Sequence, residues 1–134
     1  MKLKICLLLM ATALILSFKQ DKPATPVVKK GMIKVTVLYP NGEGIHFDMD
    51  YYAKSHIPMV QRLFGKAMKG ASIDKGIAAG APGAPLPYLA IGYLYFDNIA
   101  DFKDGMKAFG KEIQADIPKY TNTKAIIQIS EVIQ

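Results

Sequence analysis

The segment YLAIGYLYF, residues 88–96, constrains the fold of this chain more than any other. It is apolar or aromatic at almost every position, and it lies between the proline-bearing residues 81–87 and Asp97. A run of this length and composition fits a central β-strand that is covered on both of its faces. The rest of the chain must therefore supply a layer for each face.

Three other segments indicate further strands. Residues 32–39 (MIKVTVLY) alternate regularly and are rich in β-branched side chains; one face would carry Ile33, Val35, Val37 and Tyr39. Residues 125–133 (AIIQISEVI) are typical of a closing strand. Residues 67–80 alternate only weakly, but their glycines disfavour a helix, so we interpret them as a strand as well.

Two segments indicate helices. Asp48 is a suitable N-cap for a helix that runs to about Phe64, where Gly65 can end it. A second helix begins after Asn98, and apolar residues follow at spacings of three and four: Ile99, Phe102, Met106, Phe109 and Ile113. The order β-α-β-β-α-β predicts an α+β, ferredoxin-like fold, with two helices on one face of a four-stranded antiparallel sheet.

This arrangement leaves one apolar face of residues 88–96 without a cover. A large exposed apolar face marks an interaction surface, and a second copy of the chain is its simplest partner. We therefore expect a homodimer formed through the sheet face.

The N-terminal residues suggest export. Two lysines precede a run of 14 apolar residues, Ile5 to Phe18, so residues 1–20 are typical of a signal peptide. The alternative is an uncleaved N-terminal anchor, the one way in which we expect a membrane to be involved. Residues 21–31 have the composition of a linker, and residues 32–134 form the folded domain. We expect a periplasmic or secreted protein.

Charge and cysteine content exclude several kinds of site. The formal net charge is +6, but residues 32–134 carry 11 basic and 10 acidic side chains, so the domain lacks the basic excess of a nucleic-acid-binding protein. Cys6, the one cysteine, lies in the signal region, which excludes a disulfide framework and a cysteine nucleophile in a cleaved protein. The two histidines lack metal-ligand spacing. We expect neither a metal nor another cofactor.

His56 is the strongest candidate for chemistry. It lies on the same helix face as Tyr52, directed at the sheet. A buried imidazole needs a hydrogen-bond partner and resists protonation, so it can serve as a general base or as a ligand to a metal or haem iron. The alternative is a core histidine with no role beyond packing. Pro58 interrupts helical hydrogen bonding just after His56, and this irregularity favours a pocket.

Tyrosines and one carboxylate complete the candidates. Tyr93 and Tyr95 share one strand face and could bind an aromatic ligand, with Tyr39 close by on a neighbouring strand; the alternative is aromatic packing at a sheet or dimer interface. The further candidates for the substrate pocket are Tyr51 and Tyr120. Asp116 follows the second helix, where a solvated loop carboxylate is favoured over a catalytic one.

Three motifs together resemble the EthD family, named for a protein linked to ethyl tert-butyl ether degradation. They are FDMDYYAKSHIPMV (47–60), GAPGAPLPYLAIGYLYF (80–96) and ADIPKYTNTKAIIQISEV (115–132). The resemblance implies a dimeric α/β barrel in which two ferredoxin-like subunits pack sheet to sheet. It also implies a ligand cleft between the helices and the sheet of each subunit, into which His56 would project.

The resemblance leaves the activity open, because related barrels include cofactor-free oxygenases, isomerases, cyclases and decarboxylases, as well as haem proteins. Our first hypothesis is a cofactor-free enzyme of the oxygenase, isomerase or lyase type, acting on a small hydrophobic or aromatic compound. His56 would be the general base, Tyr52 and Tyr95 would orient a phenolic or carbonyl substrate, and Asp116 is a third candidate. The alternatives are a non-catalytic binding protein and a haem protein with His56 as axial ligand.

Overall fold

The computed structural model describes residues 26–134, and these follow the expected element order. The strands are β1 (Ile33–Pro40), β2 (Met68–Lys75), β3 (Tyr88–Phe96) and β4 (Ile126–Glu131). The main helical segments are α1 (Met49–Tyr51), a π-helical turn (Tyr52–His56), α2 (Ile57–Phe64) and α3 (Ile99–Asp116), with short 3-10 turns at Gly65–Ala67 and Ile117–Lys119.

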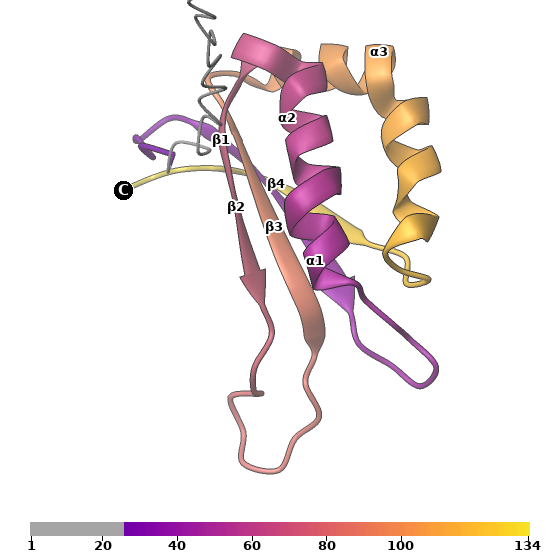
Figure 1. Ribbon diagram of the computed structural model, residues 1–134. Coiled ribbons are helices and arrows are strands. Elements are labelled where there is room, and N and C mark those ends of the chain that lie inside the picture. Colours follow the sequence, from indigo (N-terminus) through magenta and orange to yellow (C-terminus); the bar gives the residue numbers. More distant parts are fainter. Residues whose placement is uncertain (1–25) are drawn as a thin grey trace, which may run out of the picture.

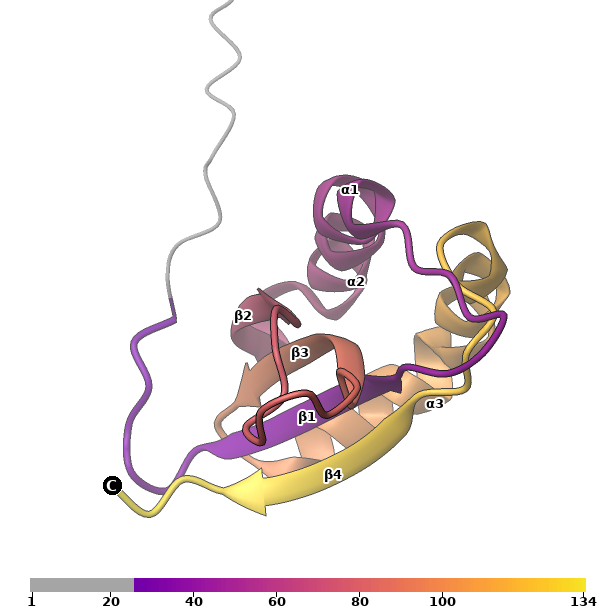
Figure 2. The same ribbon diagram turned by 90° about the horizontal axis from the view of Figure 1, so that it is seen from below.

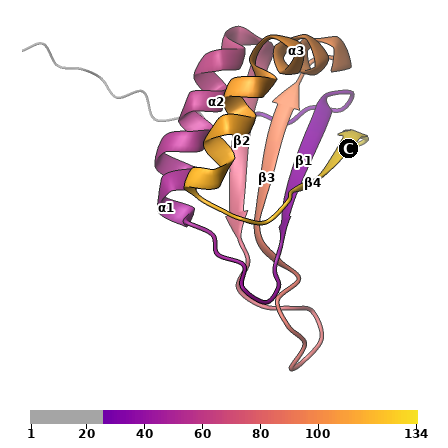
Figure 3. The ribbon, with the colours of Figure 1, turned by 90° about the vertical axis from the view of Figure 1, so that its right-hand side faces the viewer.

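The four strands form one antiparallel sheet in the order β2-β3-β1-β4 (Figure 1). Both α2 and α3 lie on the same side of the sheet, and the view from below shows the other side free of helices (Figure 2). Figure 3 shows the two helices side by side, with the β2–β3 connection extending beyond the sheet. The predicted α+β, ferredoxin-like fold is confirmed, including the central place of residues 88–96.

The hydrophobic core fills the space between the helices and the sheet. Val35 pairs with Leu94, so both side chains point to the same face, which is the helix side. Phe96 is fully buried there, and its ring lies 5.2 Å from that of Phe64 on α2 and 5.6 Å from that of Phe102 on α3. A side chain at Gly105 would overlap Phe64, so this glycine allows α3 to approach α2 closely.

The first helix is irregular at the position that Pro58 predicts. The Asp48 carboxylate accepts a hydrogen bond from the Tyr51 amide and caps the helix, as expected. Residues Tyr52–His56 then form a π-helical turn, in which the Ile57 amide donates to the carbonyl of Tyr52. Proline has no amide hydrogen and its ring displaces the carbonyl four residues earlier, and a π turn accommodates both effects. His56 is the last residue of this turn.

The other predicted boundaries are correct to within a few residues at most ends. Asn98 caps α3 by accepting a hydrogen bond from the Asp101 amide. The apolar residues spaced three and four apart along α3 face the core, apart from Ile99, which is exposed at the helix start. The second strand ends at Lys75 rather than at residue 80, because the glycine- and proline-bearing residues 76–87 form the long connection to β3.

The N-terminal predictions lie largely outside the described residues. The predicted signal peptide, Cys6 and the first part of the predicted linker precede residue 26, so export stays a prediction. Pro26 packs against Gly70, and the amide of Gly31 donates to the carbonyl of Val132. Within residues 26–134, no helix is both long and apolar enough to cross a membrane.

Candidate functional site

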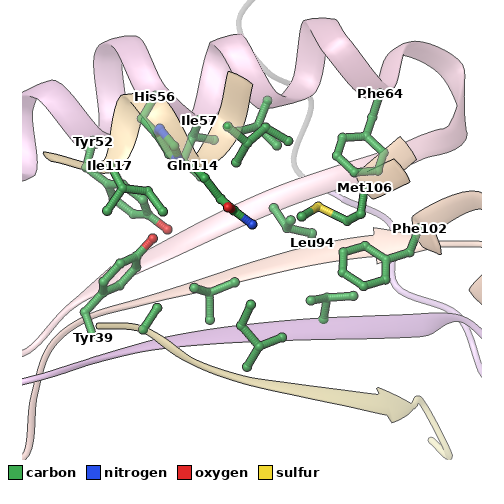
Figure 4. A pocket seen from close by; sticks show the side chains of 16 residues that line it. Tyr39, Tyr52, His56, Ile57, Phe64, Leu94, Phe102, Met106, Gln114 and Ile117 are labelled. Carbon is green, nitrogen blue, oxygen red and sulfur yellow. The ribbon is translucent and has the colours of Figure 1, made fainter. Parts of the chain in front are cut away.

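A cavity of about 120 Å³ lies between the two helices and the sheet (Figure 4). This volume is close to the ~150 Å³ of a cavity known to hold a benzene molecule. Phe64, Phe102 and Met106 line one end, and Tyr39, Tyr52 and His56 line the other. The cavity is therefore lined mainly by apolar side chains, with a polar end and the amide of Gln114 between the two ends.

His56 and Asp116 form a buried pair beside this cavity. The Nδ1 atom of His56 lies 2.8 Å from the Oδ2 atom of Asp116, and the two residues are 4% and 6% exposed. Asp116 is the last residue of α3 and turns inward, so the expectation of a solvated loop carboxylate is wrong. The two elements that face each other across the cavity thus each supply one member of the pair.

Asp116 is held in its ionised form. Its Oδ1 atom accepts hydrogen bonds of 2.9 Å from the Tyr51 hydroxyl and from the Lys119 ammonium. Burial alone would raise the pKa of Asp116, but the bonds from Lys119, His56 and Tyr51 outweigh it and lower the pKa to about 2. The carboxylate is therefore an acceptor on both oxygens at neutral pH.

This charge fixes the tautomer of His56. An ionised carboxylate cannot donate, so the proton of a neutral imidazole must lie on Nδ1, the atom that faces Asp116. The Nε2 atom is then an acceptor, and the Tyr120 hydroxyl, 3.3 Å away, donates to it. The Tyr120 oxygen in turn lies 2.8 Å from the hydroxyl of Tyr39. Four side chains are thus joined in one buried chain of hydrogen bonds.

His56 is also held in its neutral form. Burial lowers the pKa of His56, and the hydrogen bond and the charge of Asp116 oppose this effect only in part. Lys119 also contacts the Asp116 carboxylate, so that carboxylate compensates the charge of a protonated His56 only in part. A neutral imidazole at physiological pH is the form that can accept a proton.

The tyrosines of the polar end pack edge to face around this chain. Burial raises the pKa values of Tyr39, Tyr52 and Tyr120. Tyr52 reaches the sheet at Gly92, where the Cβ atom of any other residue would overlap its hydroxyl. The hydroxyl groups of Tyr39 and Tyr52 point toward each other across the cavity (Figure 4). The polar end therefore presents two protonated phenols.

Comparison with known proteins assigns the chain to a family. The model of the EthD domain matches residues 46–124, which include the π turn, Asp116 and Tyr120. The chain belongs to the EthD family. The resemblance of its three motifs to that family is thereby confirmed.

Solved structures agree with this assignment. The chain is 40% identical to an EthD-like protein from Ralstonia eutropha JMP134, with 79% of this chain and 96% of that one covered and a TM-score of 0.75. An ethyl tert-butyl ether degradation (EthD) family protein from Bacillus halodurans C-125 is 19% identical over 76% of this chain and 99% of that one, with a TM-score of 0.58, and it shares the fold. Among proteins of curated function, none matches the chain.

In this EthD-family chain two predicted pocket residues lie elsewhere. Tyr93 pairs with Thr36 and Tyr95 with Lys34, so both tyrosines project from the sheet face opposite the helices. The Lys34 ammonium lies 5.7 Å from the centre of the Tyr93 ring. The prediction that Tyr93 and Tyr95 form a ligand wall beside Tyr39 is therefore wrong. The alternative, aromatic packing on a sheet face, fits their position.

The other candidates come together, but in different roles. Tyr52 and His56 border the cavity, whereas Tyr51 contacts Asp116 and Tyr120 lies fully buried behind the lining. Sequence reasoning grouped Tyr39 with Tyr93 and Tyr95, whereas the structure places it with Tyr52 and His56. Tyr39 shares a strand face with Val35 and Val37, and this apolar face was the sequence signal that could have assigned it to the buried site.

The site does not suit a haem. Both ring nitrogens of His56 have partners, Asp116 and Tyr120, so an iron ligand would have to displace a buried hydrogen bond. The cavity of about 120 Å³ also lies below the ~300 Å³ at which pockets for larger ligands begin. Within residues 26–134, no cluster of three or more His, Cys, Asp or Glu side chains could hold a metal ion.

The pair predicts a stability that falls with acid in two stages. The pKa of His56 is lowered from 6.5 in the folded state, so its contribution to the free energy of unfolding is complete above pH 6.5 and declines below it. The pKa of Asp116 is lowered from 3.8 to about 2, so its contribution declines as the pH falls through that interval. Lys119 and Tyr120 also contact the pair, and both have raised pKa values, so they stay protonated throughout.

Urea unfolding between pH 7 and about pH 2 measures this dependence. A His56→Gln variant is expected to remove the upper stage, and an Asp116→Asn variant the lower one. Equal stabilities of the parent protein at pH 7 and pH 5 would contradict the assignment of a neutral buried His56.

Proposed function

We propose that this EthD-family protein is a cofactor-free enzyme that removes a proton from a small, largely apolar compound, with His56 as the base. One observation carries the proposal: the buried pair of His56 and ionised Asp116, 2.8 Å apart, at the polar end of an apolar cavity. A neutral histidine oriented by a carboxylate is an arrangement that serves general-base catalysis in other enzymes.

The pair suits the formation of an anion in an apolar site. When His56 accepts a proton, the Asp116 carboxylate stabilises the imidazolium that forms. The hydroxyl of Tyr52 faces the cavity and can donate to the oxygen of a phenolate or enolate product. Isomerases, lyases and oxygenases that begin by ionising a phenol or a carbonyl compound share this first step.

The test is carbon-bound hydrogen exchange in heavy water, followed by proton NMR over a panel of small cyclic ketones and phenols. The parent protein is expected to accelerate exchange for some members of the panel. A His56→Gln variant should lose at least about 10²-fold of that acceleration, the usual range for a general base.

His46 provides a matched control. It is exposed, and its hydrogen bonds with Asn122 and Thr121 use only its backbone, so a His46→Gln variant should retain the exchange rate. Full activity of the His56→Gln variant would refute the proposal. If the parent protein retains panel compounds without exchanging any hydrogen, the cavity is a binding site and the non-catalytic alternative holds.

We also propose that the protein forms a homodimer through the open face of the sheet. Partly exposed apolar and aromatic side chains on that face support this proposal: Leu38, Ile91 and Tyr93. Polar residues such as Lys34 and Asp74 share the face, so a partner would need matching polar groups. Analytical ultracentrifugation at micromolar concentration is expected to give a dimer, and a folded monomer there would refute it.

A further inference from the structure

We propose that Tyr39 is the residue that takes the proton from the ligand, and that Tyr120 relays it to His56. This inference rests on the proposed function and changes which group of the site touches the ligand. In place of direct contact with the imidazole, the ligand would meet a phenol at the end of a buried chain.

Tyr120 blocks the ring nitrogen of His56 that does not face Asp116. Its hydroxyl donates a hydrogen bond to the Nε2 atom of His56, and its side chain is fully buried. The other ring nitrogen faces Asp116. His56 borders the cavity, yet both of its nitrogens are engaged by protein groups, so a ligand cannot reach either without breaking a buried hydrogen bond.

Asp116 sets the direction of the whole chain. Because it keeps the imidazole proton on Nδ1, the Tyr120 hydroxyl must donate to Nε2. A hydroxyl has one hydrogen, and that of Tyr120 is already in the bond to Nε2. In the 2.8 Å contact between the two hydroxyl groups, Tyr39 therefore donates and the Tyr120 oxygen accepts. The lone pairs of the Tyr39 oxygen then face the Tyr52 hydroxyl, and a ligand hydroxyl that enters the cavity between them can take the place of that contact.

The transfer balances without any other reactant. The ligand's O–H bond breaks and its hydrogen joins the Tyr39 oxygen, the Tyr39 hydrogen passes to Tyr120, and the Tyr120 hydrogen passes to Nε2. The products are a ligand anion and an imidazolium 2.8 Å from the Asp116 carboxylate, with both tyrosines restored and no electron transferred. Burial raises the pKa values of both tyrosines, which favours concerted transfer over a tyrosinate intermediate.

The cavity narrows the class of ligand. Among the described residues that line it, none is Lys, Arg, Asp or Glu, so a charged ligand would lose its hydration without compensation. The relay requires a hydrogen on oxygen, and the opposite end is closed by Phe64, Phe102 and Met106. The fitting ligand is a neutral, ring-sized phenol or enol whose hydroxyl lies between Tyr39 and Tyr52.

The experiment uses 2,6-difluorophenol, a compact phenol that ionises near neutral pH, as the bound probe. Fluorine NMR reports the ionisation of the probe, and nitrogen NMR reports the protonation of His56. In the parent protein at fixed neutral pH, binding should convert the probe to its phenolate and protonate His56 to the same extent, because the proton moves from one to the other. In Tyr39→Phe and Tyr120→Phe variants at the same pH, the ratio of ionised to neutral bound probe should fall about tenfold, equivalent to about one pKa unit, and His56 should stay neutral.

Tyr93→Phe provides the matched control, because it removes a tyrosine hydroxyl from the opposite sheet face. It should retain the coupled ionisation, and thermal unfolding should show that all three tyrosine variants are folded. Coupled ionisation in either Tyr39→Phe or Tyr120→Phe, or a parent protein that does not bind the probe, would overturn the relay. The exchange test with His56→Gln judges the base independently, so the relay can fail while the proposed function stands.

Discussion

An Asp116→Asn variant is expected to fold and to lose about 10³–10⁴-fold of the proton-transfer rate, the size of effect measured when the orienting carboxylate of a catalytic triad is changed to an amide. The amide nitrogen can donate to Nδ1, which would move the imidazole proton to Nε2. Protonated Nε2 could then no longer accept a hydrogen bond from Tyr120. In addition, the imidazolium that forms during catalysis would lose the negative charge of Asp116 beside it. Nitrogen NMR of His56 should show the inverted tautomer, and the exchange assay should show the loss.

Asp50→Asn is the control for this substitution. Asp50 is exposed and pairs with Lys54 one turn along the same helix, 3.0 Å away, so its loss should change neither readout. A normal tautomer together with a full rate in Asp116→Asn would contradict the role of Asp116. A normal tautomer with a reduced rate would show that the charge of Asp116 matters more than its orientation of the ring.

A Phe96→Ala variant is expected to lower the free energy of unfolding by about 3–5 kcal/mol, the usual cost of removing a buried phenylalanine side chain. Phe96 is fully buried on the central strand, and its ring packs between those of Phe64 and Phe102. Its loss would leave a space between three elements that cannot all move inward. Urea unfolding at neutral pH measures the change.

Ile133→Ala removes apolar atoms from a residue that is 70% exposed, so its effect should stay within about 0.5 kcal/mol. A loss below about 1 kcal/mol in Phe96→Ala would show that the core between α2 and α3 collapses around the space. Such a result would contradict the tight packing that Gly105 permits against Phe64.

Most of the fold follows from local sequence patterns. The alternation in residues 32–39, the apolar run 88–96 and the caps Asp48 and Asn98 each fix a strand or a helix start through interactions with near neighbours in the chain. The weakly alternating residues 67–80 were harder to bound, because glycines allow a strand to end at several positions.

The candidate site was only partly predictable. Helical spacing correctly placed His56 on the buried face beside Tyr52. Asp116 was misjudged because the sequence analysis placed it after the end of the second helix, whereas the helix continues through Asp116 and directs its carboxylate inward. The contact between His56 and Asp116 joins residues 60 positions apart, and no local pattern encodes it.

The sequence by itself determined which residues share a face, the order of the strands and helices, and the family. Only the tertiary structure decided which face each strand turns toward the helices. Alternation has a period of two, so it groups Tyr93 with Tyr95 and Tyr39 with Val37 without saying which group is covered. The register of β1 against β3 and the packing of the helices place Tyr39 in the cavity and the other two tyrosines on the open face, because only one side of this sheet carries helices.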